Sequence, residues 1–509
     1  MNAKQKVMLI ILDGLGAAPK SKGNAVVMAD PQHLSTFWNI SPHTYLIASG
    51  ESVGLPKNVK GNSEVGHLNI GAGRVVSQNF PRINDAIQKG LFYKNNTLRD
   101  AFVHATRFNS NIHLVGLLSD GAVHSHIDHF KATIDYFAKS NFQNQIFIHA
   151  FTDGRDTPTN VALTYLTDLD KYCLEKGLGK ISTLVGRYYG MDRNMKWDRT
   201  QRAYHLLTQN YGDKFNTYQE AIQTYYSRGL TDEFLDPAVI NPSKIEANDV
   251  VLLMNFRSDR MIQLTEAFVT TPFKPFSTQN IPNLFLASMV EYRKNFPQKV
   301  VFPKQYINLP LGKIIESVGM NQLRIAETEK FPHVTYFFNG GIPIIYERED
   351  RVLIDSPKVP TYDIKPEMSA FEVTSAVIQR IPSKIYDFIL VNFANTDMVG
   401  HTGNLEAGIK AVKVVDECVR TLVREFTSYG GAVLITADHG NVEEMVNLTN
   451  NQIDTEHSLN PVPLIVVGTK VTRRNLPYGA LKDIAPTILD IMGITKPAEM
   501  TGNSLIRNV

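Results

Sequence analysis

The chain has 509 residues, more than a single hydrophobic core usually holds, so two or more domains are expected. Hydrophobic residues make up 43% and charged residues 20%, and the net charge of +2 excludes the strongly charged surfaces typical of proteins that bind nucleic acids or membranes. The two cysteines exclude a disulfide framework and fit a reducing compartment. We therefore expect a cytoplasmic globular protein with no nucleic-acid and no membrane partner.

Short apolar runs rich in Val, Ile, Leu and Phe alternate along the chain with longer amphipathic stretches. The predicted strands, in chain order, are residues 7–12, 112–118, 146–151, 181–185, 250–256, 388–393, 432–436 and 463–467. Their continuous apolar character is typical of strands buried on both faces of a parallel sheet. Between the sixth and the seventh, apolar residues recur at helical spacing over residues 409–426, which predicts a crossover helix. The first run has six residues, fewer than the roughly 7–15 of a secretory signal core, and no run reaches the ~18 of a membrane span.

Polar residues follow seven of these runs almost directly. In chain order they are Asp13-Gly14, Ser119-Asp120-Gly121, Asp153-Gly154-Arg155-Asp156, Gly186-Arg187, Asn255-Phe256-Arg257, Asn395-Thr396-Asp397 and Ala437-Asp438-His439-Gly440. Ligands of open α/β sheets bind beyond the carboxyl ends of the strands. Polar residues are common wherever a strand ends, but seven such segments in one chain favour a site built from strand ends.

The C-terminal third holds five candidate metal ligands. Asp397 and His401 are four residues apart, a spacing that points both side chains the same way on a helical turn. Asp438 and His439 emerge from a predicted strand, and His457 follows within about sixty residues of Asp397. Taken singly, each pair could be a turn cap or a solvated helix face. Together they favour a metal site, and two Asp with three His and no nearby Cys suit divalent manganese or zinc.

A candidate nucleophile lies near the other end of the chain, in GNSEVGHLNIGAGR at residues 61–74. Its glycines allow the backbone to approach a ligand closely. Ser63 in this loop has two interpretations: the N-cap of a helix, or a nucleophile whose proton is removed by a base or a metal. The polar loops contain no other candidate for an activated nucleophile, which favours the second interpretation.

Eight motifs occur in one order from the N-terminal to the C-terminal part of the chain. They are GNSEVGHLNIGAGR, DGRDTP, GRYYGMDR, NFRSDR, AETEKFPHVTYFFNGG, DMVGHTG, TADHGN and TEHSLNPVP. This series resembles that of the cofactor-independent phosphoglycerate mutases, within the alkaline phosphatase superfamily. The chain departs from it at Thr396, where many relatives have proline, at Gly190, where alanine is frequent, and in the KNVK of residues 57–60. None of these departures removes a candidate ligand or arginine.

The resemblance implies that Ser63 is the residue phosphorylated during catalysis. It implies two divalent metal ions, with manganese expected and zinc or cobalt as alternatives, and no bisphosphoglycerate cofactor. It assigns one metal to Asp13, Ser63, Asp438 and His439, and the other to Asp397, His401 and His457. It assigns substrate contacts to His124, Arg155, Asp156, Arg187, Arg193, Arg257, Arg260 and Lys330.

The predicted architecture is an α/β fold of two domains with mainly parallel sheets covered by helices. Asp13 and Ser63 must meet residues 397–457, so residues 1–79 and 306–509 form a discontinuous metal-binding, phosphatase-like domain. Residues 80–305 are then an inserted substrate-binding phosphotransferase domain that carries the arginines. Arginine forks suit a small ligand with carboxylate and phosphate groups, although surface ion pairs are the alternative for any single arginine. We interpret His126 and His129 as structural.

The resulting hypothesis is an isomerase that interconverts 3-phosphoglycerate and 2-phosphoglycerate, in glycolysis and gluconeogenesis, through a phosphoserine at a two-metal site. We expect it to act as a monomer on this small-molecule substrate. The alternatives are a phosphopentomutase-like enzyme, a metal-dependent phosphatase of the same superfamily, and a metal-binding protein without catalysis. The serine loop and the arginine series argue against the phosphopentomutase alternative.

Overall fold

The computed structural model describes residues 5–471 and 473–506, and the chain divides into two compact units. Unit 1 comprises Met1–Gln78 and Tyr306–Val509, and unit 2 comprises Asn79–Gln305. We expected the first boundary one residue later, but Asn79 begins a helix of unit 2 and its side-chain amide donates to the Phe256 carbonyl at 2.9 Å. No helix in the described ranges combines the length and the apolar composition needed to cross a membrane.

Unit 1 is built on an eight-stranded sheet in the order β12-β11-β13-β1-β14-β15-β2-β16. Its first five strands are parallel, and β15 is antiparallel to both of its neighbours. The strands are β1 (Val7–Leu12), β2 (His43–Ile47), β11 (Gln322–Glu327), β12 (Glu349–Ile354), β13 (Phe388–Phe393), β14 (Ala432–Thr436), β15 (Val462–Val467) and β16 (Gly479–Ala480). Every residue of β1, β13 and β14 is buried, as expected for central strands that are covered on both faces.

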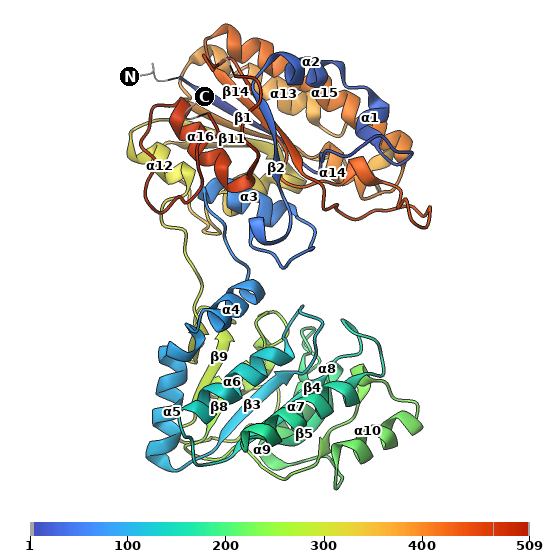
Figure 1. Ribbon diagram of the computed structural model, residues 1–509, viewed down its shortest axis with the longest axis vertical. Coiled ribbons are helices and arrows are strands. Elements are labelled where there is room, and N and C mark those ends of the chain that lie inside the picture. Colours follow the sequence, from blue (N-terminus) through green and yellow to red (C-terminus); the bar gives the residue numbers. More distant parts are fainter. Residues whose placement is uncertain (1–4, 472, 507–509) are drawn as a thin grey trace. The chain divides into compact units, whose positions relative to one another are not determined.

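Helices cover both faces of this sheet (Figure 1). The layer around the long helix α15 also contains α1, α2 and α13, whereas α12 and α16 pack against α3 in the other layer. The helices are α1 (Ala25–Ala29), α2 (Gln32–Ile40), α3 (Ser63–Ala72), α12 (Leu311–Ser317), α13 (Ala370–Ile378), α14 (Asn395–Gly400), α15 (Leu405–Ser428) and α16 (Ile484–Ile491). The shorter helical turns are η1 (Gly50–Val53), η4 (Thr328–Lys330), η5 (His333–Phe337), η6 (Tyr362–Ile364), η7 (Ile381–Ser383), η8 (Val442–Glu444) and η9 (Leu481–Asp483).

Unit 2 has its own eight-stranded sheet in the order β10-β9-β8-β3-β4-β5-β7-β6. The strands are β3 (Ile112–Leu117), β4 (Ile146–Thr152), β5 (Lys180–Gly186), β6 (Asp213–Lys214), β7 (Ala238–Val239), β8 (Val250–Leu253), β9 (Phe285–Val290) and β10 (Lys299–Phe302). The chain adds strands in one direction from β3 to β5 and in the other from β8 to β10, so the strand order reverses between β3 and β8. Ligands of such sheets bind at this point, beyond the carboxyl ends of the strands.

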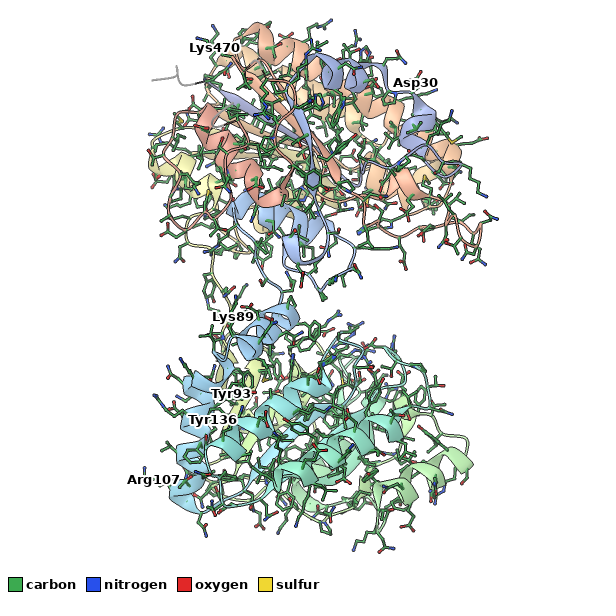
Figure 2. The ribbon with its side chains drawn as sticks, viewed as in Figure 1. Asp30, Lys89, Tyr93, Arg107, Tyr136 and Lys470 are labelled. Carbon is green, nitrogen blue, oxygen red and sulfur yellow. The ribbon has the colours of Figure 1, made fainter. Side chains whose placement is uncertain are left out.

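The helices of unit 2 form two packed groups, α6 with α7 and α10, and α9 with α11. They are α4 (Asn79–Gln88), α5 (Asn96–Phe108), α6 (Ile127–Lys139), α7 (Ala162–Lys176), α8 (Arg187–Gly190), α9 (Trp197–Gln209), α10 (Tyr218–Ser227) and α11 (Ile262–Val269), with the turns η2 (Phe92–Lys94) and η3 (Asp232–Phe234). Side chains fill the space between strands and helices within each unit (Figure 2).

The α/β class with mainly parallel sheets is confirmed, and so is the crossover helix over residues 409–426, which is part of α15. Seven predicted strands agree with the structure to within one residue at each end. The prediction for residues 250–256 is wrong at its end, because β8 stops at Leu253. There the side chain of Asn255, and not its backbone, accepts the Leu117 N–H at 2.9 Å. The remaining strands were not predicted.

Candidate active site

Four adjacent strands of unit 1 deliver charged residues to one edge of the sheet. In the order β11, β13, β1 and β14, the segments that follow them carry Lys330, Asp397, Asp13 and Asp438. The register pairs the last residue of β1 with the last residue of β13, so these segments begin at the same level. Parallel strands therefore explain why residues that are hundreds of positions apart meet here.

His457 reaches the same edge because β15 runs antiparallel to β14 and therefore starts there. The segment before β15 is fixed by a bridge between Gly440 and Ser458, in which the Ser458 N–H donates to the Gly440 carbonyl at 3.0 Å. The rings of His457 and His439 stack with their centroids 3.9 Å apart. His457 therefore precedes a strand, whereas the other charged residues at this edge follow one.

Ser63 is the first residue of α3, and the N-cap of this helix is Asn62, whose side chain accepts the Val65 N–H. The interpretation of Ser63 as the N-cap is therefore wrong. Its hydroxyl is buried and donates to Asp13 Oδ1 at 3.1 Å. It also lies 3.0 Å from His439 Nε2 and accepts from Lys330 Nζ at 2.7 Å. The serine oxygen is thus held between an acid, an imidazole and an ammonium group.

Lys330 is the buried cation at the centre of this group. Its Nζ lies 2.6 Å from Asp13 Oδ1 and 2.5 Å from Asp397 Oδ2. Burial opposes the charged form, but the carboxylates of Asp13, Asp397 and Asp438 outweigh it and raise the pKa of Lys330 above its ordinary value. The ammonium group is therefore charged near neutral pH.

His401, His439 and His457 all direct Nε2 toward the charged cluster, because Nδ1 of each ring faces a backbone carbonyl. His401 Nδ1 lies 2.7 Å from the Thr455 carbonyl, and His457 Nδ1 lies 2.7 Å from the Gly61 carbonyl. His439 Nδ1 faces a carbonyl at 3.2 Å. A carbonyl accepts from Nδ1–H, which leaves the Nε2 lone pair available as a metal ligand. The two Nε2 atoms of His401 and His457 lie 3.1 Å apart, and each lies within 3.3 Å of Asp397 Oδ1.

The electrostatics of the cluster favour a cation in addition to Lys330. Burial raises the pKa of Asp13 and of Asp397, but Lys330 and then His439 more than offset it and leave both values below their usual range. Burial likewise opposes a proton on His439, yet the carboxylates of Asp438, Asp397 and Asp13 raise its pKa to about 10. Asp438 Oδ2 is buried, and its nearest basic neighbour is His67 Nδ1 at 3.1 Å, a nitrogen that also lies 2.9 Å from the Ser63 carbonyl. Divalent ions bind such sets of carboxylate and imidazole groups, so the donor set fits a metal.

Three polar residues of this cluster were missed from the sequence. His67 lies one helical turn after Ser63 and its Nδ1 is 3.1 Å from Asp438 Oδ2. Asn392 donates to Asp13 Oδ2 at 2.8 Å, and Asn441 donates to Asp397 Oδ1 at 3.0 Å. The four-residue spacing of Ser63 and His67 was the available signal, because it points both side chains to one face of a helix.

Unit 2 gathers a second group of predicted residues at the carboxyl ends of its strands. The guanidinium group of Arg187 is buried and lies 2.6 Å from Asp153 Oδ1 and 2.5 Å from Asp156 Oδ2. Arg155 lies farther out, 3.4 Å from Glu233 Oε1. Arg187 is therefore held by the DGRD segment that follows β4.

Asp259 organises the rest of this group and was also missed from the sequence. It pairs with Arg193 at 2.7 Å and with Arg257 at 3.2 Å, and His124 Nδ1 lies 3.8 Å from its Oδ1. Burial, followed by the positive charges of Arg187, Arg193 and Arg155, lowers the pKa of Arg260. Several arginines thus repel one another here, which is the electrostatic character of an anion site.

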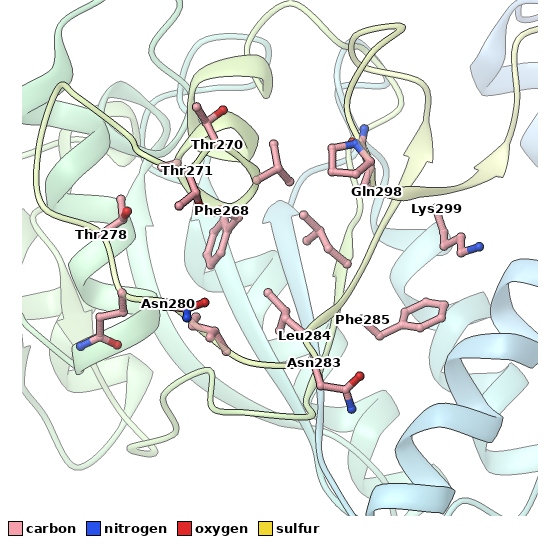
Figure 3. Close-up of a pocket in the computed structure, with 16 residues that line it drawn as sticks. Phe268, Thr270, Thr271, Thr278, Asn280, Asn283, Leu284, Phe285, Gln298 and Lys299 are labelled. Carbon is pink, nitrogen blue, oxygen red and sulfur yellow. The ribbon is translucent and has the colours of Figure 1, made fainter.

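Unit 2 also has a cavity of about 400 Å³, and none of these arginines lines it. Figure 3 shows the side chains that line this cavity. It is lined by Thr270 and Thr271 after α11 and by Phe285 and Lys299, which begin β9 and β10. Those positions belong to the amino ends of the parallel strands, whereas the arginine group lies at their carboxyl ends. The cavity is therefore separate from the candidate site.

Comparisons with known proteins identify the family of the chain. A family model described as the metalloenzyme superfamily matches residues 5–496. The chain is 48% identical over 515 residues to the 2,3-bisphosphoglycerate-independent phosphoglycerate mutase of Methanococcoides burtonii, with 99% of each chain covered, and 47% identical to that of Moorella thermoacetica, with 98% of each covered. A crystal structure of Leishmania mexicana phosphoglycerate mutase is similar with a TM-score of 0.63 and 30% identity, covering 99% of this chain and 98% of that one. The chain therefore belongs to the 2,3-bisphosphoglycerate-independent phosphoglycerate mutases of the metalloenzyme superfamily.

Proposed function

We propose that this protein is an isomerase that interconverts 3-phosphoglycerate and 2-phosphoglycerate through a phosphoserine at Ser63. The observation that carries the proposal is the environment of the Ser63 hydroxyl, which touches Asp13, His439 and Lys330 in one buried cluster. A serine in contact with an acceptor on one side and a cation on the other can act as a nucleophile toward a phosphoryl group. The names of the curated relatives supply the substrate class.

In the proposed reaction, Ser63 Oγ forms a bond to phosphorus while the bond between phosphorus and the glycerate oxygen breaks. The serine proton passes to an acceptor of the cluster, and the glycerate oxygen takes up a proton. The second half is the reverse, with the other glycerate hydroxyl as the nucleophile. Lys330 balances negative charge on the transferring group, and the amino end of α3 places backbone dipoles beside the phosphoserine.

We propose two divalent metal sites within the same cluster. Asp13, Ser63, Asp438 and His439 would hold one ion. Asp397, His401 and His457, whose ligand atoms lie within 4.8 Å of one another, would hold the other. A bound divalent ion supplies charge stabilisation for the attacking and leaving oxygens of phosphoryl transfer. Manganese is the proposed ion because imidazole and carboxylate ligands without thiolate suit it, and zinc and cobalt are the alternatives.

Unit 2 supplies the groups that we propose to hold the glycerate. The proposed contacts are His124, Arg155, Asp156, Arg187, Arg193, Arg257 and Arg260. The substrate carboxylate does not change during the reaction, so arginine forks can retain it through both transfers. Burial, followed by the charge of Arg187, lowers the pKa of His124 to about 4, so this imidazole is neutral near pH 7 and suited to a glycerate hydroxyl.

The test is turnover of 3-phosphoglycerate in an assay coupled through enolase, with manganese and without any bisphosphoglycerate. We expect activity in the wild-type protein and less than a few percent of it in Ser63→Ala with its metal content verified. Ser383→Ala, which changes a serine outside the cluster, is the control and should stay fully active. Release of inorganic phosphate in place of 2-phosphoglycerate would support the phosphatase alternative and contradict the proposal.

A further inference from the structure

Glu443 is a buried carboxylate that four donors surround. It lies in η8 and is 1% exposed. Its Oε2 accepts the backbone N–H groups of Gly16 and Asn441, both at 2.9 Å. Its Oε1 accepts a short hydrogen bond from the Ser458 hydroxyl and a second bond from Asn460 Nδ2 at 3.0 Å. Hydrogen bonds therefore compensate the burial of this charge.

These donors come from three segments: Gly16 near the N-terminus, Asn441 just before Glu443 itself, and Ser458 with Asn460 farther along the chain. Each segment carries a proposed metal ligand: Asp13 precedes Gly16, His439 precedes Asn441, and His457 precedes Ser458. Glu443 is not itself in any of the groups whose ligand atoms lie close enough to share an ion. One carboxylate thus connects the three ligand-bearing segments without belonging to the proposed ligand set.

Two glycines pack closely against the Glu443 carboxylate. A Cβ atom on Gly16 would lie 2.4 Å from Glu443 Oε1, and a Cβ atom on Gly440 would lie 2.3 Å from the same oxygen. Real Cβ atoms do not approach other atoms so closely. With the Glu443 carboxylate in this place, Gly16 and Gly440 thus lie against it with no room for a side chain of their own.

We propose that Glu443 is a positioning residue of the metal centre, which sets the spacing of Asp13, His439 and His457 by binding the three segments that carry them. An ionised carboxylate is suited to this role because both of its oxygens accept and neither donates. In a glutamine, an NH2 group replaces one of the two oxygens. The two donors that this oxygen bound would then face another donor and lose their acceptor. This inference rests on the metal site of the proposed function and adds the residue that holds its ligands in place.

The experiment measures manganese affinity in full-length protein that has been stripped by a chelator, with free manganese read by electron paramagnetic resonance. We expect Glu443→Gln to raise the Kd roughly 10- to 100-fold, the range typical of residues that orient metal ligands. Ser458→Ala removes one donor and keeps the carboxylate, so its increase should be smaller. Near-UV circular dichroism of the metal-free proteins checks that each variant is folded.

Glu349→Gln is the matched control. Glu349, at the start of β12, is also a buried carboxylate of unit 1, but it accepts from Asn339 and Arg351 and, among the residues described, contacts no proposed metal ligand. This variant should bind manganese as the wild type does. Folded Glu443→Gln with wild-type affinity, or an equal loss in Glu349→Gln, overturns the inference. If Glu443→Gln does not fold, Ser458→Ala decides, and its unchanged affinity overturns the inference. A wild type that binds no divalent ion overturns the metal site as well, so the two failures are distinguishable.

Discussion

Lys330 shows how a single residue can serve both stability and chemistry. It is 3% exposed and contacts two carboxylates and the candidate nucleophile. Burial raises the pKa of Asp13 and of Asp397, and Lys330 is the nearest charge that lowers both values again, so it stabilises two buried carboxylates side by side. Thr396 donates a short hydrogen bond to the Asp13 carbonyl and so helps to hold the same acid.

We expect Lys330→Met to abolish phosphoryl transfer and to destabilise the metal-free protein by about 3–5 kcal/mol, the cost of leaving a buried charge unpaired. Manganese should recover much of the lost stability in urea unfolding, because a cation then balances the carboxylates. Lys313→Met is the control, since its ion pair with Glu316 is half exposed and should contribute less than about 1 kcal/mol. An equal effect of the two variants on metal-free protein would contradict the assigned role of Lys330.

At the scale of elements, the start of α3 determines where the Ser63 hydroxyl points. Asn62 caps this helix by accepting the Val65 N–H at 3.0 Å, and the carbonyl of Gly61 accepts from His457. The segment at the start of α3 therefore fixes the position of Ser63 relative to the amino end of the helix and to His457.

Asn62→Ala should lower the free energy of unfolding by about 1 kcal/mol, because the Val65 N–H loses its acceptor. It should also reduce kcat, since the first turn of α3 then frays beside Ser63. Asn62→Ser keeps a capping oxygen and should remain close to the wild type in both measurements. Urea unfolding and the coupled assay report the two effects, and an Asn62→Ala protein indistinguishable from Asn62→Ser would contradict the prediction.

The packing of α6 against α4 in unit 2 makes stability depend on pH. His129 of α6 is buried, and its Nε2 lies 2.8 Å from Asn84 Oδ1 of α4. Burial, followed by the charge of His126, lowers the pKa of His129 to about 3. In the unfolded chain the value is about 6.5, so as the pH falls below 6.5 the unfolded state binds a proton that the folded state does not.

His129 should therefore reduce the free energy of unfolding by up to about 1.4 kcal/mol for each pH unit between 6.5 and its folded pKa. His129→Gln removes this titration. The free energy of unfolding of the variant should therefore depend less steeply on pH over that window, by the slope that corresponds to about one bound proton. Urea unfolding at several pH values measures the slopes. Above pH 7.5 the slopes of the two proteins should agree, and identical slopes at pH 5 would show that His129 is not buried as a neutral group.

At the scale of the whole molecule, each unit has its own core. The core cluster of unit 2 contains residues from Ile83 to Phe302 and none of unit 1 among the described residues. The main cluster of unit 1 joins residues before position 71 with residues after position 310. Unit 2 is thus continuous in sequence, whereas unit 1 depends on both ends of the chain.

We expect residues 79–305, produced alone, to fold and to unfold cooperatively in urea, because a single continuous segment supplies a complete sheet and core. Far-UV and near-UV circular dichroism with a single urea transition would support this. A chain of this length that shows secondary structure but no near-UV signal would mean that its core needs unit 1.

The sequence alone determined much of the fold and many of the candidate residues. Continuous apolar runs such as Val7–Leu12 and Phe388–Phe393 could be assigned as buried strands, because an unbroken run of apolar residues is itself the signal for a strand covered on both faces. The strand β11 was missed since Gln322, Arg324 and Glu327 give it a polar pattern, although all three are buried. The Arg324 guanidinium lies over the Phe338 ring at 4.5 Å, a partner that no local pattern reveals.

Only the tertiary structure decided which polar groups act together. Motif order pointed to Ser63, Asp397, His401 and His457, because each lies in a short segment with its own signal. The spacing of Ser63 and His67 pointed to a shared helix face, but the contact of His67 with Asp438 and the roles of Asp259 and Glu443 depend on distances to residues from other segments. The physical reason is that hydrogen bonds and charges act over a few ångströms in space, whereas a sequence pattern reports only what is near along the chain.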